Sequence, residues 1–426
     1  MARKDKQYFQ DIYAAIMDET LQTFHRVLSV AGITIFAKHN WDSKLWLSLQ
    51  IFNVIIGFLT IVFTTSFVVV NMSNILVCIQ GACIWTTGLI MYISFCVCLI
   101  FRKQFREFLD EMGFKDAMLE MPLIEYVLKL ERVGRLNELK GMVVDSQEKL
   151  LKLTRVLLKT YVFSVWACAT LYLSDSVYSM FTRQDDDTRL LGFEMWVPWS
   201  LKNFNVYLIT YFFNAYSGYL CCIAYPGFQL TIILLVGQTV RQLRILTFIL
   251  VHLDELVLEI TDKRGEKWQA YCTAIFSQCV NHYIKLKRFS NKLNVICRPF
   301  YLALILDAIM LVCVCSVKIA ISNKTSPDTM KYYVHEFCFI MVVLMFCTLG
   351  QQVENECARL ETAVTENWYI FNRTHNIHVR IFKMALSQRM PIYIFGTITL
   401  SAPTFTWFLK TGMSFFTLVM SVLDEN

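Results

Sequence analysis

Residues 45–101 contain no charged side chain. A helix rises about 1.5 Å per residue, so it crosses a hydrocarbon layer of about 30 Å in roughly 20 residues. The stretch is long enough for two crossings, and Asn71, Ser73 and Asn74 provide polar residues for a turn between them. Because so long an apolar stretch is unfavourable in contact with water, the sequence predicts a fold that lies within a membrane.

Five further apolar segments follow, and the composition agrees with a membrane protein. Hydrophobic residues make up 56% of the chain and charged residues 17%, whereas about a quarter of a soluble domain is charged. We predict an all-α membrane protein, with residues 1–426 in a single seven-helix membrane domain. Its transmembrane helices are expected at about residues 46–70, 75–100, 156–181, 204–240, 299–320, 333–353 and 391–422.

The basic residues alternate between the two sides of these segments. Of the 40 Lys and Arg residues, 33 lie before the first segment or in every second gap after it, and 6 lie in the other gaps. Cytosolic loops carry an excess of Lys and Arg, so we predict a cytosolic amino terminus and, after seven crossings, an extracellular carboxyl terminus. G-protein-coupled receptors have the opposite orientation, which argues against that class.

Glycosylation sequons offer a second, weaker indication of orientation. Asn71 and Asn323 fall on the predicted outer side, and Asn372 falls inside. Only the outer side can be N-glycosylated. Because Asn71 is close to the bilayer, Asn323 is the predicted glycosylation site.

Catalytic motifs are missing from the sequence. There is no HExxH, no CxxC pair with metal-ligand spacing, no GxSxG and no Gly-rich phosphate loop. We therefore expect no enzymatic activity, no cofactor, no metal site and no nucleic-acid partner. Cysteines within apolar segments are more often small buried hydrophobic residues than ligands.

Most residues outside the membrane lie on the predicted cytosolic side. Apolar residues recur there at helical spacing, as in Ile245, Phe248 and Ile249. We expect the transmembrane helices to continue into the cytosol and to pack as an anchor for subunit assembly, formed by residues 241–298 and 354–390. A helix break is expected near Asn372 and a helix end before Pro391, because proline disfavours helical geometry at the preceding residue.

Aromatic residues gather in the outer halves of several segments. Together with scattered hydroxyls they are compatible with a mostly apolar pocket for a small, volatile, lipophilic ligand, or with an aromatic belt that faces lipid. The candidate ligand-binding residues are Trp85, Trp166, Tyr172, Ser176, Tyr178, Tyr207, Tyr211, Phe212 and Phe337.

Two ionisable residues lie deep within apolar segments, where charge is costly and often functional. Lys410, in the last segment, either faces water in an ion pathway or reaches the interface or a carboxylate. Asp307, in the fifth segment, either pairs across helices or lies in a solvated cavity.

Motifs near the carboxyl end carry a family resemblance. Gln351-Gln352-Val353, Trp368-Tyr369, Met390-Pro391 and the stretch from Pro403 to Leu418 are similar to those of insect odorant receptors. Trp196-Val197-Pro198-Trp199 and the terminal Ser-Phe-Phe-Thr-Leu resemble the moth subset, which includes pheromone receptors.

The resemblance implies an odorant- or pheromone-gated, non-selective cation channel. It further implies a heterotetramer with odorant receptor coreceptor subunits, in the plasma membrane of a sensory neuron dendrite. The last helix would line the pore, whose candidate residues are Lys410, Ser414, Thr417, Leu418, Met420 and Ser421. A gustatory-type receptor channel is the alternative, and a G-protein-coupled receptor is less favoured.

Overall fold

The computed structural model describes residues 17–114, 116–130, 134–182, 190–321, 327–366, 370–395 and 398–424. The chain is mostly helical, and residues 17–30 form a helix before the first labelled element. The elements are α2 (Lys44–Val70), α3 (Ile75–Ile100), α4 (Arg102–Leu109), the π-helix η1 (Asp110–Phe114), the 3-10 helix η2 (Ala117–Glu120), α5 (Pro122–Lys129), α6 (Arg135–Thr182), α7 (Phe204–Val251), α8 (Leu253–Thr261), α9 (Glu266–Ile321), α10 (Pro327–Thr365), α11 (Arg373–Ser387), β1 (Tyr393–Phe395), β2 (Ile398–Thr399) and α12 (Ala402–Asp424).

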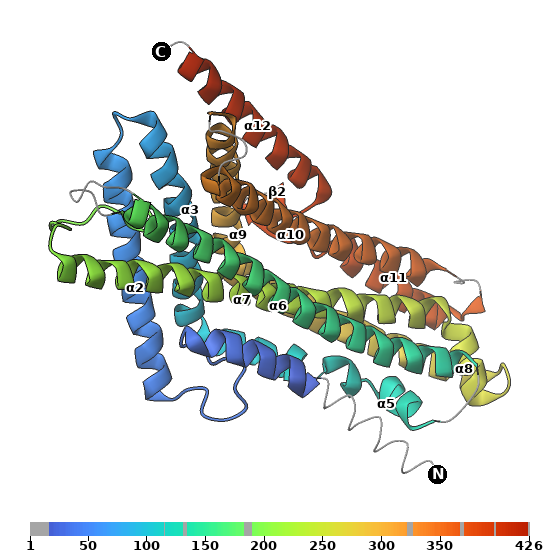
Figure 1. The fold of residues 1–426 in the computed structure, drawn as a ribbon. Helices are drawn as coiled ribbons and strands as arrows, with labels where there is room; N and C mark the ends of the chain where they lie inside the picture. Colours follow the sequence, from blue (N-terminus) through green and yellow to red (C-terminus); the bar gives the residue numbers. More distant parts are fainter. Residues whose placement is uncertain are drawn as a thin grey trace.

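Four helices are much longer than a membrane crossing requires. α6 and α7 have 48 residues each, α9 has 56 and α10 has 39. At 1.5 Å per residue, 48 residues span about 72 Å, more than twice the hydrocarbon thickness. Figure 1 shows α6, α7 and α10 running alongside one another. Each must therefore continue beyond the bilayer.

Six helices within the described ranges are long and apolar enough to cross a membrane: α2, α3, α6, α7, α9 and α10. α12 falls short of that apolarity because Lys410 and several hydroxyl residues interrupt it. Its 23 residues nevertheless span about 34 Å.

The predicted seventh span, residues 391–422, begins too early. α12 starts only at Ala402, and the residues before it form an antiparallel hairpin of β1 and β2 that pairs Tyr393 with Thr399. Pro391 ends helical geometry, and the aromatic and β-branched residues that follow favour strands. α11 ends at Ser387 and its amino end is capped by Asn372, in agreement with the predicted break.

The hairpin lies directly against α10. A Cβ atom at Gly350 would lie 2.1 Å from the carbonyl oxygen of Leu400, so only glycine permits this approach. The side-chain oxygen of Gln351 also accepts a hydrogen bond of 3.2 Å from the backbone N–H of Ala402, at the start of α12. α10 and α12 are therefore joined through backbone contacts as well as side chains.

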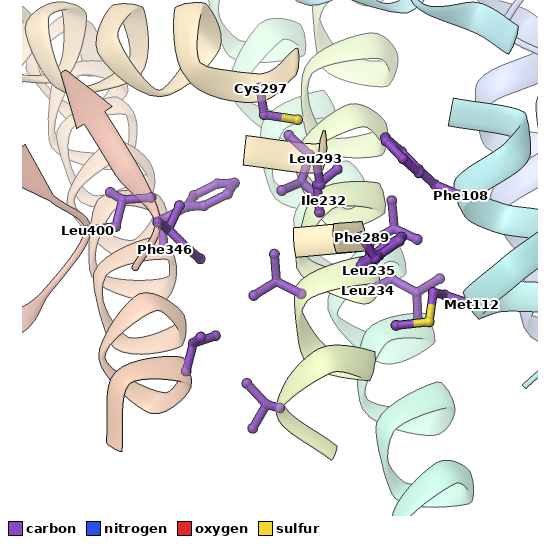
Figure 2. Close-up of a cluster of buried hydrophobic side chains, with 14 of the residues drawn as sticks. Phe108, Met112, Ile232, Leu234, Leu235, Phe289, Leu293, Cys297, Phe346 and Leu400 are labelled. Atoms are coloured by element: carbon purple, nitrogen blue, oxygen red, sulfur yellow. The ribbon is translucent and has the colours of Figure 1, made fainter. Parts of the chain in front are cut away.

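α7 forms the centre of the helical core. It is apolar on every side, and nearly all of its residues from Leu220 to Leu250 are buried. Figure 2 shows Ile232, Leu234 and Leu235 of α7 in one buried cluster with residues of other elements. The labelled partners are Phe108 of α4, Met112 of η1, Phe289, Leu293 and Cys297 of α9, Phe346 of α10 and Leu400.

A buried polar network joins α7 to its neighbours in the part of the chain predicted to be cytosolic. Arg241 Nη2 lies 2.6 Å from Asp116 Oδ2, and the two side chains are only 3% and 1% exposed. Gln242 donates a hydrogen bond of 3.3 Å to the same carboxylate and lies 2.8 Å from His282 Nε2 of α9. Removing one partner of such a pair costs about 3–5 kcal/mol, since a charge is left buried.

His282 makes this network sensitive to acid. Burial lowers its pKa to about 4, with Lys285 and Arg241 acting in the same direction and Asp116 and Glu120 opposing them. An unfolded histidine has a pKa of about 6.5. The folded state thus binds fewer protons than the unfolded state between these values, and stability falls as pH drops from about 6.5 toward 4, by about 3 kcal/mol in all.

We therefore expect His282→Gln, which keeps a hydrogen-bonding group beside Gln242, to reduce the loss of thermal stability between about pH 7.5 and about pH 5. Unfolding midpoints of the purified protein measure this, with His39→Gln, an exposed position, as the matched control. An unchanged pH dependence in the His282 variant would show that the acid sensitivity lies elsewhere.

Candidate functional site

A cavity of about 80 Å³ lies among α3, α6, α7 and α10. Its wall is almost entirely apolar, with a few polar groups, among them the hydroxyls of Thr87, Tyr172 and Tyr225 and the imidazole of His335. An apolar enclosure with a few orienting polar groups is the usual form of a small-molecule site.

Regular helical spacing brings the lining residues together. From α3 come Ile84, Thr87, Gly88 and Met91, which repeat every three or four positions and so share one face. α7 contributes Ser217, Gly218, Cys221, Cys222 and Tyr225 in the same way. Most of these side chains are small, and where small residues of two helices face each other the packing leaves a void.

A loop before α7 closes part of the cavity. Phe193 stacks on Tyr172 with ring centroids 5.6 Å apart. The buried side chain of Asn214 accepts a hydrogen bond of 3.0 Å from the Phe193 N–H and donates one of 2.8 Å to the Phe193 carbonyl. Trp199 donates to Thr210 at 2.9 Å. The loop is therefore held to α7 at two points.

Of the nine predicted ligand-binding residues, only Tyr172 lines this cavity. Four point outward, with exposed fractions of 46% for Trp166, 68% for Tyr178 and 64% for both Phe212 and Phe337. Exposed aromatics of this kind agree with the alternative, an aromatic belt.

Three of the other four join neighbouring elements, whereas Ser176 bonds within its own helix, α6. Trp85 donates to Thr65 of α2, Tyr207 donates to the Leu190 carbonyl, and both Ser176 and Tyr211 donate to the Leu173 carbonyl. Eight of the nine predicted positions are aromatic and the ninth, Ser176, carries a hydroxyl, whereas most of the small residues that line the cavity carry neither signal. The residues missed include Gly88, Ser217, Gly218, Cys221, Cys222 and His335.

The predicted pore residues lie on α12, which has one packed and one exposed face. Phe408 and Gly412 pack inward, and a Cβ atom at Gly412 would lie 3.2 Å from Val312 of α9. On the opposite face, five exposed polar residues repeat every three or four positions: Thr406, Lys410, Ser414, Thr417 and Ser421. Leu418 is exposed as well, whereas Met420 is partly buried against the core.

The two deep ionisable residues differ in their surroundings. Lys410 is exposed and makes no ion pair with any residue that the structure describes, so pairing with a carboxylate of the same chain is not found. Asp307 is buried on α9, and its Oδ2 has no hydrogen-bond partner within the described ranges.

A family described as 7tm odorant receptor matches residues 74–413. Odorant receptor 13a of Drosophila melanogaster is 20% identical over 386 residues, covering 86% of this chain and 85% of the relative.

Solved structures show the same fold. The insect olfactory receptor OR5 from Machilis hrabei in complex with eugenol superposes with a TM-score of 0.79 at 10% identity, covering 96% of this chain and 99% of that one. A second structure of OR5 from Machilis hrabei gives a TM-score of 0.76 at 11% identity, covering 94% of this chain and 97% of that one. At this identity the likeness concerns the fold alone.

Asn214→Ala should release the loop that carries Phe193. The variant loses two hydrogen bonds worth about 1 kcal/mol each, so amide hydrogen exchange at Phe193 should become roughly 30-fold faster. Exchange measured by mass spectrometry tests this, with the exposed Asn205→Ala as control. Equal protection in both variants would mean that the loop is held by other contacts.

Proposed function

Since this chain belongs to the insect odorant receptor family, we propose that it is the odour-tuning subunit of a ligand-gated, non-selective cation channel. It would assemble as a tetramer with coreceptor subunits in the plasma membrane of a sensory neuron dendrite. The basic residues support a cytosolic amino terminus. The observation that carries the proposal is the apolar cavity among α3, α6, α7 and α10.

The chemistry of the cavity wall defines the ligand class. Apolar side chains favour a small, volatile, lipophilic molecule, such as an odorant or a pheromone, and the Tyr172 hydroxyl offers a hydrogen bond to one polar group. A cavity of about 80 Å³ is smaller than the roughly 150 Å³ that holds benzene in an engineered protein core. Most odorants would therefore fit only if the helices around the cavity move apart.

Because the cavity must widen, ligand binding favours one conformation of the protein over the other. A ligand shifts an equilibrium only by binding one conformation better than the other, and a ligand too large for the present cavity favours the wider one. α10 carries the displacement, since the same helix lines the cavity at Phe339 and contacts the β-hairpin at Gly350, about 17 Å further along. Gln351 then contacts the start of α12.

The polar face of α12 supports its role as the pore helix. Lys410 has no ion pair with a residue that the structure describes, and an ammonium is costly against lipid, so it is satisfied if this face lines a water-filled path between subunits. The hydroxyls of Thr406, Thr417 and Ser421 already donate to carbonyls of α12 itself. Leu418, exposed beside Thr417, is a candidate for an apolar constriction that blocks ions by excluding water.

A substitution inside the cavity tests the ligand site. A Cβ atom at Gly88 would meet nothing closer than Thr60, at 4.0 Å, so Gly88→Leu can extend into the cavity without straining α3. We expect at least about a tenfold loss of potency for activating odorants, because about 1.4 kcal/mol of binding is lost. Phe212→Ala, on the exposed surface of α7, should leave potency unchanged.

Dose–response currents from cells that express the chain with a coreceptor, with G-protein signalling blocked, measure both variants. Surface labelling confirms their delivery to the membrane. A potency shift in Phe212→Ala but not in Gly88→Leu would place the ligand site outside the cavity, and loss of all current on G-protein blockade would refute the channel.

Lys410 provides the test of the pore. An ammonium group about 4 Å from a permeating cation repels it by about 1 kcal/mol in a water-like medium. Lys410→Gln should therefore raise the single-channel cation conductance up to about fivefold. Phe415→Leu, exposed but outside the polar face, is the control. Equal conductance in Lys410→Gln and the unmodified channel would remove Lys410 from the ion path.

A further inference from the structure

Three side chains with metal-binding atoms meet behind the wall of the cavity. Cys83 of α3 and Cys315 of α9 are buried with their sulfur atoms 3.5 Å apart, and Nδ1 of His335 on α10 lies 3.4 Å from Cys83 Sγ. All three potential ligand atoms lie within 4.8 Å of one another. No other group of this kind occurs among the residues that the structure describes.

We propose that Cys83, Cys315 and His335 bind a single Zn²⁺ ion that joins α3, α9 and α10 beside the ligand cavity. The sequence predicted no metal site, because Cys83 lies more than 200 positions before the other two residues and the three match no spacing motif. The proposal stands on this cluster alone and does not depend on the proposed channel function.

The three residues supply three of the four ligands of a tetrahedral zinc site, and two of their three separations are close to the values for zinc. The third separation, between the Cys315 sulfur and the His335 ring nitrogen, is within 4.8 Å. With Zn–S bonds of about 2.3 Å and a Zn–N bond of about 2.0 Å, two sulfur ligands lie about 3.8 Å apart and a sulfur and a nitrogen about 3.5 Å apart. The observed separations of 3.5 Å and 3.4 Å differ from these by a few tenths of an ångström. Side-chain rotation within the cluster can supply that difference.

Charge balance also favours Zn²⁺ in this apolar setting. Binding converts both thiols to thiolates and releases two protons to solvent, so two negative sulfurs and one dication form a neutral group with the neutral imidazole. A neutral group avoids most of the cost of burying charge. Soft thiolate ligands additionally select zinc over calcium and magnesium.

The remaining nitrogen of His335 already has a suitable partner. Nε2 lies 3.1 Å from Thr87 Oγ1, so with Nδ1 on the metal the Nε2–H donates to that hydroxyl. Thr87 in turn donates to the Cys83 carbonyl at 3.0 Å. Metal-bound histidines commonly make such a second hydrogen bond, which orients the ring.

Direct zinc binding tests the proposal. The full chain, purified with its coreceptor, is stripped with a chelator under reducing conditions, dialysed against Zn²⁺ and analysed for metal content. We expect one Zn²⁺ per chain to be lost in Cys83→Ser and in Cys315→Ser and retained in Cys221→Ser, a buried cysteine of the cavity wall outside the cluster. His335→Gln should lower the affinity at least about tenfold, as loss of a ligand or its orienting group does.

X-ray absorption of the unmodified protein tests the zinc ligands without relying on variants that have to fold. It should show two sulfur neighbours at about 2.3 Å and a nitrogen at about 2.0 Å. Equal zinc content in the unmodified chain and both cluster variants would overturn the proposal. So would a Cys83–Cys315 disulfide found by mass spectrometry in protein kept reduced.

Discussion

The arrangement of the chain depends on α7, a helix without a polar face. It is buried along most of its length, and even Gln229 and Gln238 lie within the core. A helix that is apolar all round has to be enclosed, and α3, α6, α9 and α10 enclose it. Each of these long helices therefore packs one side against α7, and the rest of its surface can contact lipid or neighbouring subunits.

At the cavity, the helices around α7 do not pack completely against it. Ser217 and Cys221 of α7 line the cavity together with Gly88 of α3, and side chains of that size leave part of the space between the helices unfilled. Gly218, by contrast, is packed against the Phe193 ring. The same helices that border the void extend far beyond it. In the proposed mechanism α10 links the cavity to the segment before α12, because its Gly350 lies against the backbone at Leu400.

Hydrophobic patterning was sufficient to predict an all-α membrane fold, because long apolar segments have few alternatives in a bilayer. It misplaced the start of the last span, since Tyr393 to Phe395 are apolar and become a strand. The candidate site was harder to predict. Aromatic residues such as Phe212 and Phe337 were chosen by their depth in the membrane, whereas the cavity depends on which helix face is turned inward. The cluster depends on the contacts of Cys83 with Cys315 and His335, each more than 200 positions away. A local sequence motif cannot reveal such contacts.

Photo-crosslinking can determine whether odorants bind in the cavity among α3, α6, α7 and α10. An activating ligand that carries a diazirine is bound, irradiated and located by peptide mass spectrometry. If odorants act from the cavity, adducts form within residues 84–91 of α3 and 217–225 of α7, and an excess of unmodified ligand abolishes them. Adducts that are abolished in this way at the outward-facing Phe212 or Phe337, with none in those two segments, would contradict binding in the cavity.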